Sequence, residues 1–240
     1  MGGRKAAFTL SMQLSHLARA ARHGLRSHTW HGVHSPFVFS LVKHVFRNDL
    51  PDKWSSGTAP NGPERSSQLE HSRMYRQLSR LVRHLNVVNL LEIGDPPGSD
   101  SILLTQALRK GNLITLSSSD DQHASAHRRP ELTGVATTRL VGDPVSRVQF
   151  ALDRLQVVGL IVFNEEFDER TTMALFHTCM LHTGQEIAVA VRGIHGTAAR
   201  RRAWEHMKQH PQATVTIDLF QMGLIFHRPH QAVQHFNLRY

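Results

Sequence analysis

The sequence predicts an α/β protein with a mostly parallel β-sheet that carries helices on both faces. From residue 87 onward, short apolar runs alternate with helical segments, which is the pattern of repeated strand–helix units. Only residues 220–223 separate the last two apolar runs, and a connection that short makes an antiparallel hairpin. Gly94 and Gly98 lie between the first strand and the next helix, where open α/β sheets bind their ligands.

The first 65 residues are expected to form a helical cap or arm and a linker, ahead of an α/β domain at residues 66–240. Residues 6–23 suit a basic amphipathic helix. Ser35 is expected to cap a second helix that has Pro36 at its first position and runs to about residue 48. Residues 51–67 are rich in Pro, Gly and Ser, which favours a linker. A helix with one apolar stripe follows. The stripe consists of Leu78, Leu81, Val82 and Leu85.

Within the α/β region, apolar runs and helical patterns define the remaining elements. Strands are expected at residues 88–93, 112–117, 137–141, 158–163, 186–191, 214–219 and 224–227. Helices are expected at residues 100–109, 145–155, 169–182 and 198–209. This order predicts a doubly covered sheet whose last two strands form a hairpin.

Composition limits the classes of function. The chain has 240 residues and a net charge of +9, which favours an anionic partner such as nucleic acid, an acidic protein, a phosphorylated substrate or a membrane surface. No apolar run approaches the roughly 20 residues of a membrane span, and the N-terminus makes a poor secretory signal. We therefore expect a cytoplasmic protein. Cys179 is the one cysteine, so an internal disulfide is excluded, and we expect this thiol to be buried in a helix.

The turn after the first strand carries the main chemical signal. It reads Glu92-Ile93-Gly94 and then reaches Gly98. Glycine permits a tight turn and a close approach of ligand to backbone, and a helix N-terminus favours a carboxylate or phosphate. An ordinary βα turn is the alternative.

Two segments carry a resemblance to known families. Leu-Glu-Ile-Gly-x-x-x-Gly at residues 91–98 resembles motif I of class I S-adenosylmethionine (SAM)-dependent methyltransferases, especially their O-methyltransferase-like branch. His-Gly-Val-His-Ser-Pro-Phe-Val-Phe at residues 31–39 resembles the opening of an uncharacterised methyltransferase-like family common in Bacteroidetes. The similarity extends from about residue 22 to the end. It implies a Rossmann-like class I methyltransferase sheet and SAM as the cofactor.

The resemblance also assigns roles to individual residues. His195 at the rim of the site is the candidate general base, and a structural or surface His is the alternative. His34 and Phe37 are expected on the substrate side. The residues expected to bind the cofactor are Glu92, Gly94, Gly98, Ser117, Asp143 and Asn164.

The sequence departs from the family pattern at several of these positions. Pro96 and Pro97 in the glycine loop lack the N–H groups that hold a carboxylate. Ser117 stands where the second strand normally ends in an acid that holds the ribose, and Asp120 and Asp121 replace it only if their loop folds back. Asn164 stands where an Asp is usual, in a position that binds a divalent cation in metal-dependent relatives. Arg192 replaces a second such carboxylate and repels cations, so no metal site is expected.

Two interpretations of this pattern stay open, and a third is weaker. The first is a SAM-dependent methyltransferase-like protein that transfers a methyl group to an oxygen or nitrogen acceptor. The second is a catalytically inactive methyltransferase-fold protein that serves as a binding or interaction module, because cofactor motifs are degenerate. The third is a basic nucleic-acid-binding protein. The acceptor and the oligomeric state are not specified by the sequence.

Overall fold

The computed structural model describes residues 34–47, 64–95, 101–118, 134–164, 167–182 and 186–238. These residues form one eight-stranded sheet with the strand order β3-β2-β1-β4-β5-β7-β6-β8. The strands are β1 (Asn89–Ile93), β2 (Gly111–Ser117), β3 (Val135–Val141), β4 (Leu160–Phe163), β5 (Ile187–Arg192), β6 (Val215–Asp218), β7 (Met222–His227) and β8 (Gln234–Asn237). Only β7 runs against its neighbours, because it pairs antiparallel with both β5 and β6. The predicted hairpin and the mostly parallel sheet are therefore confirmed.

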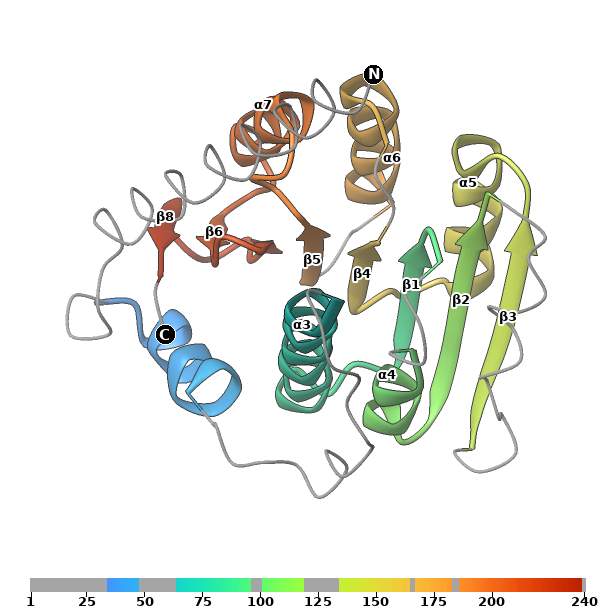
Figure 1. Ribbon diagram of the computed structural model, residues 1–240, viewed down its shortest axis with the longest axis horizontal. Helices are drawn as coiled ribbons and strands as arrows, with labels where there is room; N and C mark the ends of the chain where they lie inside the picture. The colour runs from blue at the N-terminus through green and yellow to red at the C-terminus, as the bar shows by residue number, and fades with distance from the viewer. Residues whose placement is uncertain are drawn as a thin grey trace.

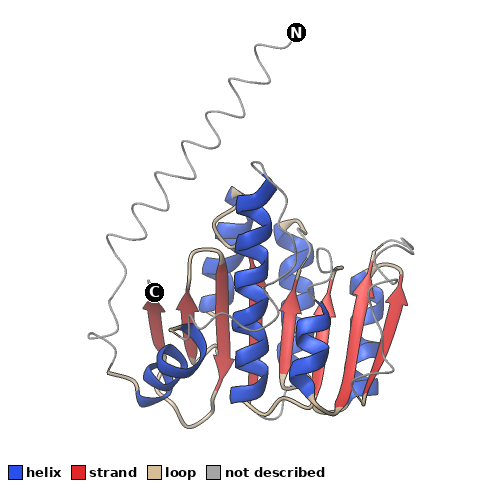
Figure 2. Cartoon of the chain, turned by 60° about the horizontal axis from the view of Figure 1, so that its bottom comes forward, coloured by secondary structure: helices blue, strands red, loops and turns tan. Residues whose placement is uncertain are grey.

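Helices cover both faces of this sheet (Figures 1 and 2). One face carries α2 (Pro36–Leu41), the π-helical turn η2 (Val42–Phe46), α3 (Glu64–His84) and α4 (Ser101–Leu108), whose apolar side chains join one core. The other face carries α5 (Pro144–Leu155), α6 (Glu169–Leu181) and α7 (Ala198–Lys208), which share a second core. No helix in the described part of the chain is long and apolar enough to cross a membrane.

Local sequence signals explain where these helices begin. Ser35 caps α2 by accepting a hydrogen bond from the Val38 N–H (3.4 Å), with Pro36 at the first helical position. The Asp143 carboxylate caps α5 in the same way, accepting from the Ser146 N–H at 3.0 Å. The Asp168 carboxylate caps α6 through the Thr171 N–H, and these hydrogen bonds lower the pKa of Asp168. In α6, Cys179 is fully buried as predicted, and burial raises the pKa of its thiol.

Two elements differ from the sequence-based expectation. Helix α3 begins at Glu64, inside the segment 51–67 that was expected to be a linker. A count of Pro, Gly and Ser therefore placed the end of the linker too late. Strand β8 was not predicted. It pairs only with β6 at the end of the sheet, and its side chains are alternately half-buried and exposed, so its sequence carries little apolar signal.

Candidate functional site

Most of the residues predicted to bind a cofactor lie at one edge of the sheet. Strands β1, β2, β3, β4, β5 and β6 all end at this edge, which we call the carboxyl edge; β7 begins there. Glu92 and Gly94 come from the end of β1, Ser117 ends β2, and Asn164 follows β4. Gly98, Pro96 and Pro97 lie outside the described residues, as do Asp120 and Asp121. The topology thus gathers side chains that are up to 72 positions apart in the sequence.

A buried polar network forms the floor of this edge. Glu92 is fully buried in β1, and its carboxylate accepts hydrogen bonds from the Thr115 hydroxyl (3.1 Å) and the Asn164 amide (3.4 Å). The same amide nitrogen lies 3.3 Å from the Gly94 carbonyl oxygen. The Tyr75 hydroxyl, from α3, donates to the amide oxygen of Asn164 at 2.7 Å. Asn164 therefore joins β4 to β1 and α3, and its amide is occupied by protein partners.

A second polar cluster lies beside this floor, where β1, β2 and β3 end. Asp95 directly follows Gly94, and its Oδ2 atom accepts hydrogen bonds from the Ser117 hydroxyl and from Arg139 (3.0 Å). The same Arg139 nitrogen lies 2.7 Å from the Ser117 Oγ atom. Neither Asp95 nor Arg139 was predicted as a site residue from the sequence. Arg139 lies inside a strand and has no neighbouring motif, so only the strand register brings it to this place.

His195 meets a carboxylate at the same edge. It follows β5, and its Nε2 atom lies 2.7 Å from Oδ2 of Asp218, the last residue of β6. The other Asp218 oxygen accepts the Phe220 N–H at 2.8 Å, and the Phe220 ring stacks on His195 with centroids 5.1 Å apart. Phe220 holds a positive φ of 68°, a conformation that is costly for an aromatic residue.

The turn that carries His195 is held by the start of α7. Gly193 adopts φ 64°, and its N–H donates to the Gln221 carbonyl at 2.6 Å. Arg200 donates to the Gly193 carbonyl (3.3 Å), and Arg201 donates to the carbonyl of His195 itself (3.5 Å). Arg200 and Arg201 therefore fix the backbone that presents the imidazole.

The remaining predicted site residues are Asp143, Phe37 and His34. Asp143 is at the carboxyl edge, where its carboxylate caps α5. Phe37 is at the opposite edge, since it packs edge-to-face on Phe226 (5.0 Å between centroids), and Arg228 stacks on it at 4.1 Å. His34 borders the same region. The structure therefore does not bring His34 and Phe37 together with Glu92.

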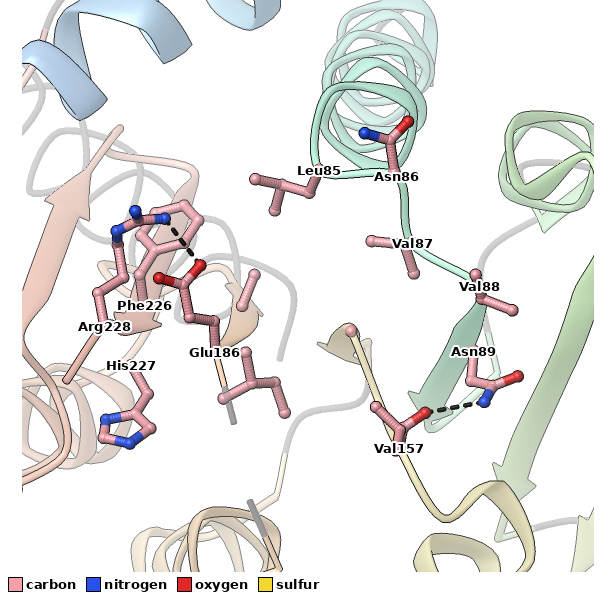
Figure 3. A pocket seen from close by; sticks show the side chains of 13 residues that line it. Leu85, Asn86, Val87, Val88, Asn89, Val157, Glu186, Phe226, His227 and Arg228 are labelled. Atoms are coloured by element: carbon pink, nitrogen blue, oxygen red, sulfur yellow. Dashed lines mark hydrogen bonds and ion pairs between the residues drawn. The ribbon is translucent and has the colours of Figure 1, made fainter. Parts of the chain in front are cut away.

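A cavity of about 350 Å³ also lies at this opposite, amino edge (Figure 3). Val88, Val157 and Phe226 contribute apolar walls, and an ion pair between Arg228 and Glu186 (3.1 Å) borders it. Among the predicted cofactor-binding residues that the structure describes, none lines this cavity. The polar clusters of the carboxyl edge and this cavity are therefore separate features.

The described residues of the carboxyl edge include few ligands for a metal ion. Arg192 ends β5 there, and Asn164 is occupied as described above. In the part of the chain that the structure describes, no three His, Cys, Asp or Glu side chains converge on one point. Hard cations need several oxygen ligands, and these residues do not supply them.

Two solved structures share this fold at low sequence identity. The chain is similar to the cofactor-bound protein Rv0187 from MTB, with 18% identity and a TM-score of 0.53, over 70% of this chain and 91% of that one. It is also similar to the O-methyltransferase TomG from Streptomyces achromogenes, solved in complex with SAM, with 15% identity and a TM-score of 0.51, over 81% of this chain and 90% of TomG. No protein-family model and no curated protein matches the sequence.

The sheet order, the C-terminal hairpin and these likenesses define the fold. The chain has the α/β Rossmann-like fold of class I methyltransferases, with helices that precede the first strand. At identities below 20% the likeness establishes the fold and leaves the activity to the site. The resemblance of residues 31–39 to a Bacteroidetes family stays a prediction.

Proposed function

We propose that this protein is a SAM-dependent methyltransferase that acts on an oxygen or nitrogen acceptor, with His195 as the general base. The observation that carries the proposal is the His195–Asp218 pair, with its 2.7 Å contact. It lies at the edge of the sheet where the glycine turn ends β1 and where open α/β sheets bind ligands. An imidazole oriented by a carboxylate is a common arrangement for taking a proton from a reacting group.

The residues of the carboxyl edge fit SAM in chemical type. Gly94 adopts φ 86°, and because it has no side chain a ligand can approach its backbone closely. Asp95 keeps a buried carboxylate oxygen, Oδ1, that has no hydrogen-bond partner among the described residues, and SAM carries hydroxyl donors that suit an acceptor. Gly94, Asp95 and Asp143 would hold the cofactor above the floor made by Glu92 and Asn164. When bound, SAM supplies a sulfonium methyl group that an oxygen or nitrogen lone pair can attack.

The residues of this chain would remove the proton from the methyl acceptor. With Nε2–H donating to Asp218, the lone pair of the ring is on Nδ1, which takes the proton from the acceptor's O–H or N–H group. Asp218 then lies beside the imidazolium and offsets its charge. Phe220 keeps the ring plane fixed by stacking. Asp218 is therefore a positioning residue, and His195 is the proposed catalytic residue.

Binding is measured first, by calorimetric titration of the full chain with SAM and S-adenosylhomocysteine. We expect micromolar affinity. Transfer of a labelled methyl group from SAM is then measured against a panel of phenols, catechols and amines. A folded protein that gives no heat at millimolar ligand would overturn the proposal and favour the inactive interaction module.

The role of His195 is tested on an acceptor found in that panel. His195→Asn should lower kcat by roughly 100- to 10,000-fold and leave the affinity for S-adenosylhomocysteine unchanged. Asp218→Asn should lower kcat less and leave KM nearly unchanged, because it removes orientation and keeps the base. His206→Asn is the matched control, since His206 lies on α7 with a side chain 54% exposed. An unchanged kcat in His195→Asn would show that the imidazole is only structural.

A further inference from the structure

The end of β2 lacks the acid that the fold leads one to expect, and a carboxylate from another strand reaches it. Ser117 is the last residue of β2 and is fully buried. Its hydroxyl donates to Oδ2 of Asp95, which directly follows the glycine at the end of β1. Parallel pairing of β1 with β2 brings the two strand ends together. A negative charge is thus present beside Ser117, although no acidic residue ends β2.

We propose that Asp95 takes over the missing role and binds the vicinal hydroxyl groups of the cofactor's ribose. This inference rests on the proposed function, because it assumes that an adenosine-containing ligand binds at this edge. The part of the ligand that Asp95 would recognise is a pair of neighbouring hydroxyl donors, for which a carboxylate is a strong acceptor. The loop residues Asp120 and Asp121 are not needed for this role.

The state of the carboxylate supports this assignment. Its Oδ2 atom is held by Ser117 and Arg139. Its Oδ1 atom is buried and has no hydrogen-bond partner in the described ranges. A buried acceptor without a donor costs free energy, so a ligand hydroxyl that donates to Oδ1 removes that cost on binding.

Arg139 fixes the direction of this carboxylate. Its guanidinium contacts both Asp95 and Ser117, and its side chain is only 13% exposed. The ion pair offsets the charge of Asp95 and prevents the side chain from rotating away from β2. Arg139 is therefore a positioning residue for Asp95.

The experiment compares two ligands and three variants by calorimetric titration. The ligands are S-adenosylhomocysteine and its 2′,3′-dideoxy analogue. The variants are Asp95→Asn, the double variant Asp95→Asn/Ser117→Asp, and the matched control Asp153→Asn on α5, whose side chain is 61% exposed. We expect Asp95→Asn to weaken binding of S-adenosylhomocysteine roughly 10- to 100-fold, the amount for a charged hydrogen bond. We expect the double variant to recover affinity and Asp153→Asn to bind like the parent protein.

The dideoxy analogue gives a test that needs no substitution at Asp95. The parent protein should bind it roughly 10- to 100-fold more weakly than S-adenosylhomocysteine, and Asp95→Asn should bind the two ligands with similar affinity. Equal binding of both ligands by the parent protein would overturn the assignment of Asp95 and leave the proposed function standing. No binding of either ligand by the folded parent protein would overturn both.

Discussion

Among single residues, Glu92 shows how the site keeps a carboxylate in the interior of the sheet. A buried charge is costly unless donors surround it. Thr115 and Asn164 both donate to this side chain, and Tyr75 in turn donates to the Asn164 oxygen. The amide of Asn164 is suited to this place because it donates to Glu92 and accepts from Tyr75 at the same time. An Asp at this position would offer two acceptors and no donor.

Asn164→Asp is therefore expected to destabilise the protein at neutral pH. The new carboxylate would lie about where an amide nitrogen now contacts Glu92 at 3.4 Å, and two like charges would share a buried place. We expect a loss of about 3 kcal/mol in the free energy of unfolding, measured by urea titration at pH 7. The loss should shrink as the pH falls, because one of the two facing carboxyl groups then takes a proton.

Tyr75→Phe serves as the control for this change. It removes one donor to Asn164 and adds no charge, so we expect a loss of about 1 to 2 kcal/mol that does not depend on pH between 5 and 7. Equal unfolding free energies for the parent protein and Asn164→Asp at pH 7 would contradict the network described for Glu92.

Among the elements, α7 and β7 meet where Trp204 packs directly against Gly223. Gly223 of β7 has no side chain, and the six-membered ring of Trp204 occupies the space beside it. A Cβ atom at Gly223 would lie 2.5 Å from the Cζ3 atom of Trp204. Gly223 also pairs with Asp218 in β6, so this contact lies next to the partner of His195.

Gly223→Ala is expected to destabilise the protein by about 1 to 3 kcal/mol, because a fully packed ring must move to admit the methyl group. Urea unfolding gives the loss. In the background of Trp204→Leu, where the ring is absent, the same substitution should cost distinctly less. Equal costs in the two backgrounds would show that Trp204 does not limit this position.

At the scale of the whole molecule, the periodicity of apolar residues predicted most strands of the sheet, but it did not predict the contacts within the site. The hairpin β6–β7 was predicted because the connection after residue 219 is too short for a crossover, and this physical limit does not depend on tertiary contacts. Strand β8 was missed because its pairing with β6 supplies the stability that its mixed sequence lacks. Helix α3 begins at Glu64, earlier than the Pro-, Gly- and Ser-rich composition of residues 51–67 indicated.

Local sequence signals could not predict which residues contact each other within the site. His195 was selected as a candidate base, but Asp218 lies 23 positions away and becomes its neighbour only when β6 lies in the sheet. Asp95 meets Arg139 across 44 positions through the register of three strands. Residue type and spacing along the chain report strand ends, whereas pairs such as these are set by strand order.

Three histidines at separate places have lowered pKa values and give the molecule a common response to acid. The pKa of His84 is lowered from 6.5 by burial and by nearby His44, and that of His210 by burial, His177 and His227. Burial also lowers the pKa of His235, where Lys208 acts in the same direction and Glu205 opposes it. In each case the unfolded chain takes up a proton more readily than the folded protein does. Stability therefore rises with pH across the range between the lowered folded pKa values and 6.5.

We expect the free energy of unfolding to fall as the pH is reduced from about 7 to about 5, and to be nearly flat from 7 to 8 with respect to these groups. The capping carboxylate Asp168 has a pKa below 3.8, so its stabilising contribution is lost only at still lower pH. Urea unfolding at constant ionic strength gives the profile. Replacing His84, His210 and His235 together with Gln should flatten it, whereas His230→Gln, a change at an exposed position, should leave its slope close to that of the parent protein. A parent profile that stays level or rises toward pH 5 would contradict the assignment of lowered pKa values to these three side chains.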